Sequence, residues 1–119
     1  MANPNIINVT DIRANTAVMN VTTVSTALVT NSSGSNSVYK IVLLSATNIS
    51  DTDSVAVSVN LERSSIPYSL GRNLNIPLNS SLAIVTKDAA LYLIEGDVIK
   101  CSATANSNAQ IICSYEVIS

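Results

Sequence analysis

The sequence has no histidine, phenylalanine or tryptophan, and it has two cysteines, three glycines and three prolines. Without histidine it lacks the side chain that most often serves as a general acid or base at neutral pH, and the usual serine triad is excluded. Two cysteines without histidine cannot complete a zinc site. The glycine motifs that bind phosphates or form a nucleophile elbow are also missing. We therefore expect a non-enzymatic protein with no catalytic, cofactor-binding or metal-binding residues.

Charge is sparse as well. Charged residues make up 12% of the chain, the net charge is −2, and the lysines and arginines do not cluster, whereas nucleic-acid binders carry a basic patch. No run of 18 apolar residues occurs, and the start MANPNIINVT lacks the basic and apolar segments of a secretory signal. We predict a soluble chain made in the cytoplasm, without nucleic-acid or membrane partners.

The residues that are abundant favour strands and turns. Asn, Ser and Thr account for 42 of 119 residues, so the core must consist of Val, Ile, Leu and Ala. About eight short apolar stretches separated by turn signals predict an all-β chain forming a single antiparallel β-sandwich, of the jelly-roll or Ig-like type, over residues 1–119. Residues 1–15 are either an N-terminal arm or the first strand.

Two strands are clearest. The stretch DSVAVSVNLE alternates apolar with small or polar residues from Val55 to Leu61, which predicts one buried face. The preceding stretch, VYKIVLLSATN, is apolar in both phases and predicts a central strand or one covered by a partner. The short polar link between the two predicts a hairpin. Prolines and a glycine interrupt residues 61–80, where we expect short edge strands.

Each of the last two predicted strands contains one cysteine. A hairpin centred on Ser107 would place Cys101 opposite Cys113, at a separation that a disulfide can span. A cytoplasmic protein would keep both thiols reduced. Two small core residues, a disulfide formed after release from the cell, and metal ligands all remain open. The same hairpin would place Lys100 diagonal to Glu116 as a surface ion pair.

The acidic residues offer two candidate sites. Asp51 and Asp53 have a spacing seen in calcium loops, but the glycine and distal glutamate of such loops are missing, so a solvated turn competes with a weak calcium site. Glu95 and Asp97 flank Gly96, which predicts a glycine turn with capping or solvated acids. Tyrosines are the only aromatics, and this scarcity argues against a glycosidase groove or a sugar-binding platform.

The stretches VYKIVLLSATNISDTDSVAVSVNL and NIPLNSSLAIVTKDAALYLIEGDVIKCSATANSNAQIICSYEVI together resemble small β-sandwich virion proteins of tailed bacteriophages, including many cyanophages. The resemblance covers roughly residues 37–118 and consists of turn and core positions. The matching residues are Asn48, Val55 to Leu61, Ile76, Pro77, Ser80, Leu91, Leu93, Gly96, Asp97 and Ile99.

This resemblance implies a capsid decoration or cement protein that stabilises the head by bridging capsomers. Its partners would be the major capsid protein or another virion protein and copies of itself, with a homotrimer at local threefold junctions as the expected oligomer. One alternative is a structural component of the neck, tail or fibre. A second is a secreted adhesin or carbohydrate-binding module.

Overall fold

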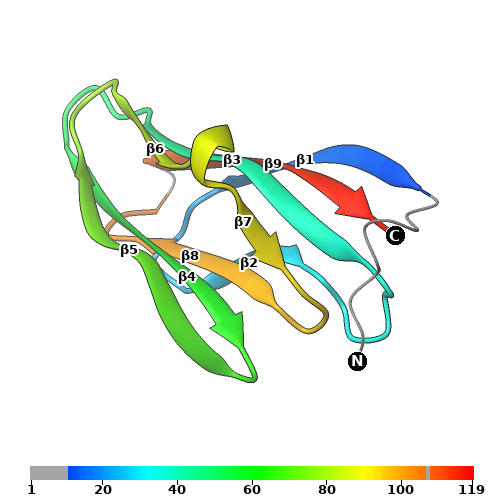
Figure 1. Ribbon diagram of the computed structural model, residues 1–119. Coiled ribbons are helices and arrows are strands. Elements are labelled where there is room, and N and C mark those ends of the chain that lie inside the picture. Colours follow the sequence, from blue (N-terminus) through cyan, green and yellow to red (C-terminus); the bar gives the residue numbers. More distant parts are fainter. Residues whose placement is uncertain (1–10, 107) are drawn as a thin grey trace.

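The computed structural model describes residues 11–106 and 108–119, which form two antiparallel sheets packed face to face (Figure 1). The strands are β1 (Ile12–Asn20), β2 (Thr26–Thr30), β3 (Val38–Asn48), β4 (Val55–Arg63), β5 (Ile66–Ile76), β6 (Ser81–Val85), β7 (Leu91–Leu93), β8 (Val98–Ala103) and β9 (Ala109–Ile118). A 3-10 turn, η2 (Lys87–Ala89), precedes β7. The predicted all-β sandwich is confirmed, with nine strands in the described residues instead of about eight.

Sheet A has the strand order β1-β9-β3-β6, and β7 pairs with β3 beside β6. Sheet B has the order β2-β8-β4-β5. Aliphatic side chains from the facing surfaces form one core between the sheets. No helix within the described ranges is long and apolar enough to cross a membrane.

The two clearest sequence patterns define the centre of this core. On β4 the alternation is confirmed, because Val55, Val57 and Val59 are buried while the residues between them are only partly covered. The central position of β3, between β9 and the pair β6 and β7, is also confirmed. Its two apolar phases result from a register shift between Ile41 and Leu43, which lets both Ile41 and Leu44 face the core.

The predicted hairpin between β3 and β4 is wrong. These strands belong to different sheets, and the link at residues 49–54 carries the chain across the core. Each strand has a buried face, and the two faces meet across the sandwich instead of lying side by side. Alternation identifies which face of a strand is buried, but it does not identify the neighbouring strand.

The predicted hairpin of β8 and β9 is wrong for the same reason. Cys101 on β8 lies opposite Val59 in sheet B, and Cys113 on β9 lies opposite Leu44 in sheet A. The predicted turn centre, Ser107, lies outside the described residues. Lys100 forms its ion pair with Glu62 at 3.1 Å, because the predicted partner, Glu116, belongs to the other sheet.

Residues 61–80 lie at an edge, as predicted, but they do not form several short strands. A two-residue turn, with φ of 54° at Ser64 and 64° at Ser65, returns the chain into β5, an eleven-residue strand. Pro67 is tolerated because β5 is the outer strand of sheet B. At Gly71 a Cβ atom would lie 2.3 Å from a methyl group of Leu74, so any larger residue there would require the Leu74 side chain to move.

The first strand begins at Ile12, so part of the segment 1–15 belongs to the sandwich. The alternative prediction, an N-terminal arm, falls mainly on residues 1–10, which lie outside the described residues.

Candidate functional site

Asn48, the last residue of β3, is fully buried where the chain leaves sheet A for sheet B. Its Nδ2 donates to the backbone carbonyls of Asp53 and Ile76, each at 2.9 Å, and its Oδ1 accepts the N–H of Ser50 at 2.9 Å. Asn48, Ser50, Asp53 and Ile76 form what we call the Asn48 cluster. One side chain thus connects the end of β3 to the start of β4 and the end of β5.

Asn31 occupies the equivalent place where the chain leaves β2 in sheet B for β3 in sheet A, and it is also fully buried. Its Nδ2 donates to the carbonyls of Ser37 and Leu93, each at 2.9 Å, and its Oδ1 accepts the Ser35 hydroxyl at 2.5 Å. We call these four residues the Asn31 cluster. Both asparagines therefore satisfy backbone groups that the strand ladders leave unpaired.

An ion pair lies beside the Asn31 cluster. The Asp97 side chain is 1% exposed and accepts two hydrogen bonds from Arg63, from Nε at 2.8 Å and from Nη2 at 2.6 Å. Asp97 also accepts the N–H of Ile94 at 3.0 Å. The hydrogen bond to Asp97 raises the pKa of Arg63, against the opposing effect of desolvation. The bidentate geometry compensates the buried carboxylate and joins β4 to the turn before β8.

The turn that contains this carboxylate has the predicted structure. Gly96 has a φ of 89°, and the acids on either side of it cap backbone groups. Glu95 accepts the N–H groups of Gly34 and Asn36, at 3.1 and 2.9 Å, and so holds the loop between β2 and β3. The sequence analysis missed Arg63 as the partner of Asp97, since 34 positions separate them and no local pattern links them.

The other acidic pair lies in the exposed turn between β3 and β4. The N–H of Asp53 donates to the Ser50 hydroxyl at 3.0 Å, and the Thr52 hydroxyl donates to the Asp53 carboxylate at 3.2 Å. Asp51 is exposed in the same turn. Within the described residues, no three or more His, Cys, Asp or Glu side chains are grouped as metal ligands would be. The contacts are those of a solvated polar turn.

Both cysteines are free thiols buried in the core. Burial raises the pKa of Cys101 to about 11 and that of Cys113 to about 12, so both are neutral at physiological pH. A buried thiol in an apolar environment is a poor nucleophile and a poor metal ligand. Of the three interpretations that the sequence left open, the structure has the first, two small core residues.

The outer faces of the two sheets differ. On the outer face of sheet A, large apolar side chains of β1, β9, β3 and β7 are exposed among polar and charged ones such as Ser45, Ser114 and the Lys40–Glu116 pair, and Val18 is 71% and Ile112 42% exposed. We call this surface the apolar face. It consists of Val18, Leu43, Tyr92 and Ile112. The outward positions at the centre of sheet B are instead polar or charged, with Ser58, Asn60, Glu62, Lys100 and Ser102.

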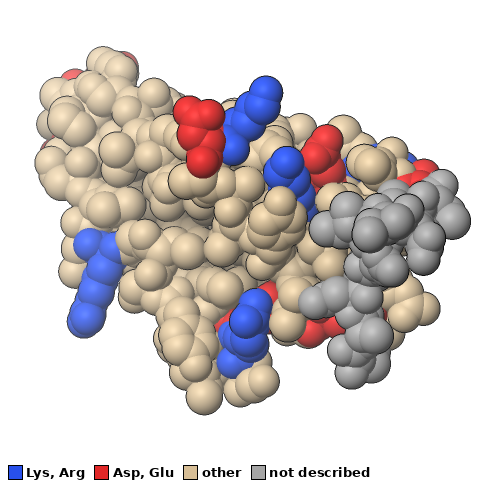
Figure 2. Space-filling view, in the orientation of Figure 1, with Lys and Arg blue, Asp and Glu red and all other residues tan. Residues whose placement is uncertain are grey.

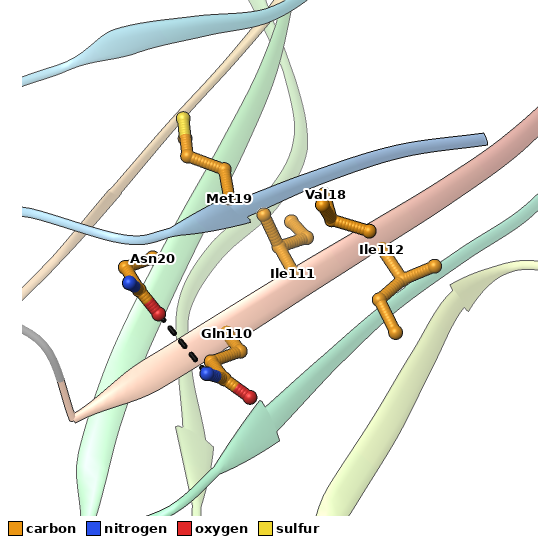
Figure 3. A pocket seen from close by; sticks show the side chains of 6 residues that line it. All are labelled: Val18, Met19, Asn20, Gln110, Ile111 and Ile112. Carbon is orange, nitrogen blue, oxygen red and sulfur yellow. Dashed lines mark hydrogen bonds between the residues drawn. The ribbon is translucent and has the colours of Figure 1, made fainter.

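A shallow depression lies at the β1 side of the apolar face (Figure 3). Its lining consists of Val18, Met19, Asn20, Gln110, Ile111 and Ile112. A hydrogen bond of 3.1 Å between the Gln110 and Asn20 side chains closes one end (Figure 3). No acid or base lines this depression, so it offers contact surface without proton-transfer groups. The view in Figure 2 shows scattered charges and no continuous basic patch.

No protein-family model matches the chain, and no curated protein matches it.

Proposed function

We propose that this protein is a non-enzymatic structural protein of a bacteriophage particle, and that it acts as a decoration or cement protein bound to the major capsid protein on the head. The observation that supports this most is the difference between the outer faces of the two sheets. A subunit that binds a shell on one side and meets water on the other needs apolar contact groups on one face only, and the exposed apolar side chains of sheet A, set among polar ones, have no counterpart at the polar centre of sheet B.

The polar groups that could do chemistry have structural partners instead. Asp97 is neutralised by Arg63, and Glu95 binds backbone N–H groups. These contacts fasten the turn before β8 to β4 and to the loop between β2 and β3. A rigid subunit with a modest apolar contact can reinforce a shell that is under load from packaged DNA when many copies act together, because multiplied weak contacts produce strong overall attachment.

The copy number in the particle distinguishes this function from its alternatives. Purified particles that encode this chain should be analysed by quantitative mass spectrometry against the major capsid protein. On the order of hundreds of copies supports decoration, whereas on the order of ten copies supports a neck, tail or fibre component. Absence from the particle would contradict both functions and leave the adhesin or carbohydrate-binding module.

Matched substitutions on the two faces test which one binds. Ile112→Lys places a charge on the apolar face, and Ser102→Lys places the same charge on the outer face of sheet B. We expect Ile112→Lys to reduce rebinding to particles stripped of the protein at least tenfold, while Ser102→Lys rebinds like the wild type. Equal loss in both variants, with both folded, would exclude the apolar face as the binding surface.

A further inference from the structure

The strand β1 is an open edge of sheet A. It pairs with β9 on one side, and no described strand pairs with it on the other. Asp11 and Ser119 exchange both backbone hydrogen bonds at 3.0 Å, and every second pair of an antiparallel ladder does so. The odd-numbered residues of β1 therefore bond to β9. The even-numbered residues direct their backbone N–H and C=O groups away from β9, in the plane of the sheet and toward its edge. These outward residues are Ile12, Ala14, Thr16, Val18 and Asn20.

This edge lacks the features that usually prevent strands from pairing between molecules. Residues 14–20 contain no charge, proline or glycine, and the register with β9 is regular along the whole strand. The other long edge strand, β5, contains Pro67 and Gly71 and has two register shifts against β4. The edge strands β2 and β6 have five residues each, and each has a register shift. Among the described edges, β1 is thus the long and regular one.

We propose that β1 pairs antiparallel with β1 of a second copy of this chain, across a two-fold axis at Thr16. Thr16 is the central residue of β1, so this register gives the longest overlap. It places Thr16 opposite Thr16 of the second copy, and Ala14 opposite Val18. Residues whose backbone groups point away from β9 then lie opposite residues of the same kind in the second copy, all along the pair, as an antiparallel ladder requires.

The side chains fit a second copy of the same strand. Arg13 is the only charged residue of β1, and it would face Met19 of the second copy, so no like charges meet. It already forms an ion pair of 3.2 Å with Asp11. The outward N–H of Thr16 now donates to the Asn15 side chain at 2.8 Å, and this exposed contact is easily replaced by a strand partner.

The pairing would also extend the apolar face. A two-fold axis between antiparallel strands of one sheet is perpendicular to that sheet, so the outer faces of both copies lie on the same side. Val18, which is 71% exposed, would gain Ala14 of the second copy as a neighbour. The result is a symmetric dimer and not the trimer expected from the resemblance. This inference does not depend on the proposed function, because self-association can be measured without any virion.

Cysteine cross-linking tests the register. In Thr16→Cys the two new thiols would lie at the two-fold axis, with Cα atoms about 5.5 Å apart, which a disulfide can span. Asn20→Cys is the matched control on the same strand and face, and its thiols would be about 27 Å apart in the dimer. We expect mild oxidation to convert most of Thr16→Cys into covalent dimer and little of Asn20→Cys. Equal cross-linking, or none in Thr16→Cys, would overturn the proposal.

Mass measurement by sedimentation equilibrium tests the edge independently. The wild type should have twice the mass of the chain, and Thr16→Lys, which places two lysines opposite each other, should raise the dimer dissociation constant at least tenfold. Thr16→Pro should act similarly, since the N–H that it removes does not bond to β9. Thr16→Ser should remain dimeric. Circular dichroism and thermal unfolding establish that each variant is folded. A wild-type monomer or trimer, or a dimer insensitive to Thr16→Lys, would contradict the proposal.

Discussion

The two ends of the sandwich perform the same structural task with different chemistry. At each end the chain crosses between the sheets, and a buried asparagine at the end of one sheet donates to two backbone carbonyls at the sheet that the chain enters. The Asn48 cluster uses neutral groups only. The Asn31 cluster is accompanied by the ion pair of Arg63 with Asp97 and by Glu95.

The difference reflects what each crossing must connect. At the Asn48 end the third hydrogen bond goes to the backbone of Ser50, two residues away, so the turn is fixed locally. At the Asn31 end the loop between β2 and β3 must also be held against the distant turn before β8, and the charged groups provide these longer connections. The crossings at residues 31–37 and 49–54 have similar lengths, so the charged groups at the Asn31 end accompany its contact with a distant turn and not a longer crossing.

The largest effect is expected at the neutral end. Asn48→Ala removes the partner of three backbone groups that cannot rotate to find another, the buried carbonyl of Ile76 and the partly buried carbonyl of Asp53 and N–H of Ser50, and creates a small cavity. We expect a loss of about 3 kcal/mol in the free energy of unfolding, measured by urea denaturation. A loss below about 1 kcal/mol would show that water replaces the side chain and that the cluster does not hold the crossing.

Asn31→Ala should cost less, about 2 kcal/mol. It leaves two buried carbonyls unpaired, but its third partner is the Ser35 hydroxyl, which is partly exposed and, unlike the backbone N–H of Ser50, can turn to water. The same urea measurement, carried out beside Asn48→Ala, gives the order of the two ends. A larger loss in the free energy of unfolding for Asn31→Ala than for Asn48→Ala would contradict this order.

Arg63→Ala tests the charged contribution directly. It leaves the buried carboxylate of Asp97 without its cation, but the Arg63 side chain is 45% exposed, so solvent already screens the pair. We expect a loss of about 1.5 kcal/mol at neutral pH, measured by thermal and urea unfolding. Arg63→Lys should recover only part of it, because an ammonium group cannot form the bidentate contact. Full recovery by lysine would mean that charge alone matters.

The core between the two ends should weaken at alkaline pH. An unfolded thiol ionises near its ordinary pKa of 9.0, whereas buried Cys101 and Cys113 keep their protons to about 11 and about 12. Above pH 9 the folded state therefore binds more protons than the unfolded state, and stability falls as pH rises. We expect a loss of about 1 kcal/mol per thiol at pH 10, by urea denaturation. Cys101→Ala with Cys113→Ala should remove this slope, and an unchanged slope would assign it to other groups.

The smallest effect is expected for Glu95→Gln. The amide oxygen can still accept one of the two N–H groups, so global stability should change by less than about 0.5 kcal/mol. Hydrogen exchange at the amides of Gly34 and Asn36 should nevertheless accelerate several-fold, because their carboxylate acceptor is lost. Exchange that stays unchanged would show that Glu95 does not fix the loop.

Patterns along the chain were reliable for local structure and poor for pairing. The alternation from Val55 to Leu61 and the doubly apolar stretch from Val38 correctly predicted a half-buried strand and a central one. Both hairpin predictions were wrong, because a strand that follows another in a sandwich can lie beside it or across the core from it, and the two arrangements bury the same residues. The Gly96 turn was predicted, but Arg63 was not, since its contact with Asp97 is not local.

The sequence by itself determined the fold class, the composition of the core and the positions of the turns, because these depend on side-chain size, branching and spacing within a few residues. Only the tertiary structure decided which strands share a sheet, that Asn31 and Asn48 fasten the two crossings, and that exposed apolar side chains gather on the outer face of sheet A. Those features depend on contacts between segments distant in the chain. Their free energies become favourable only when the two sheets are already packed together.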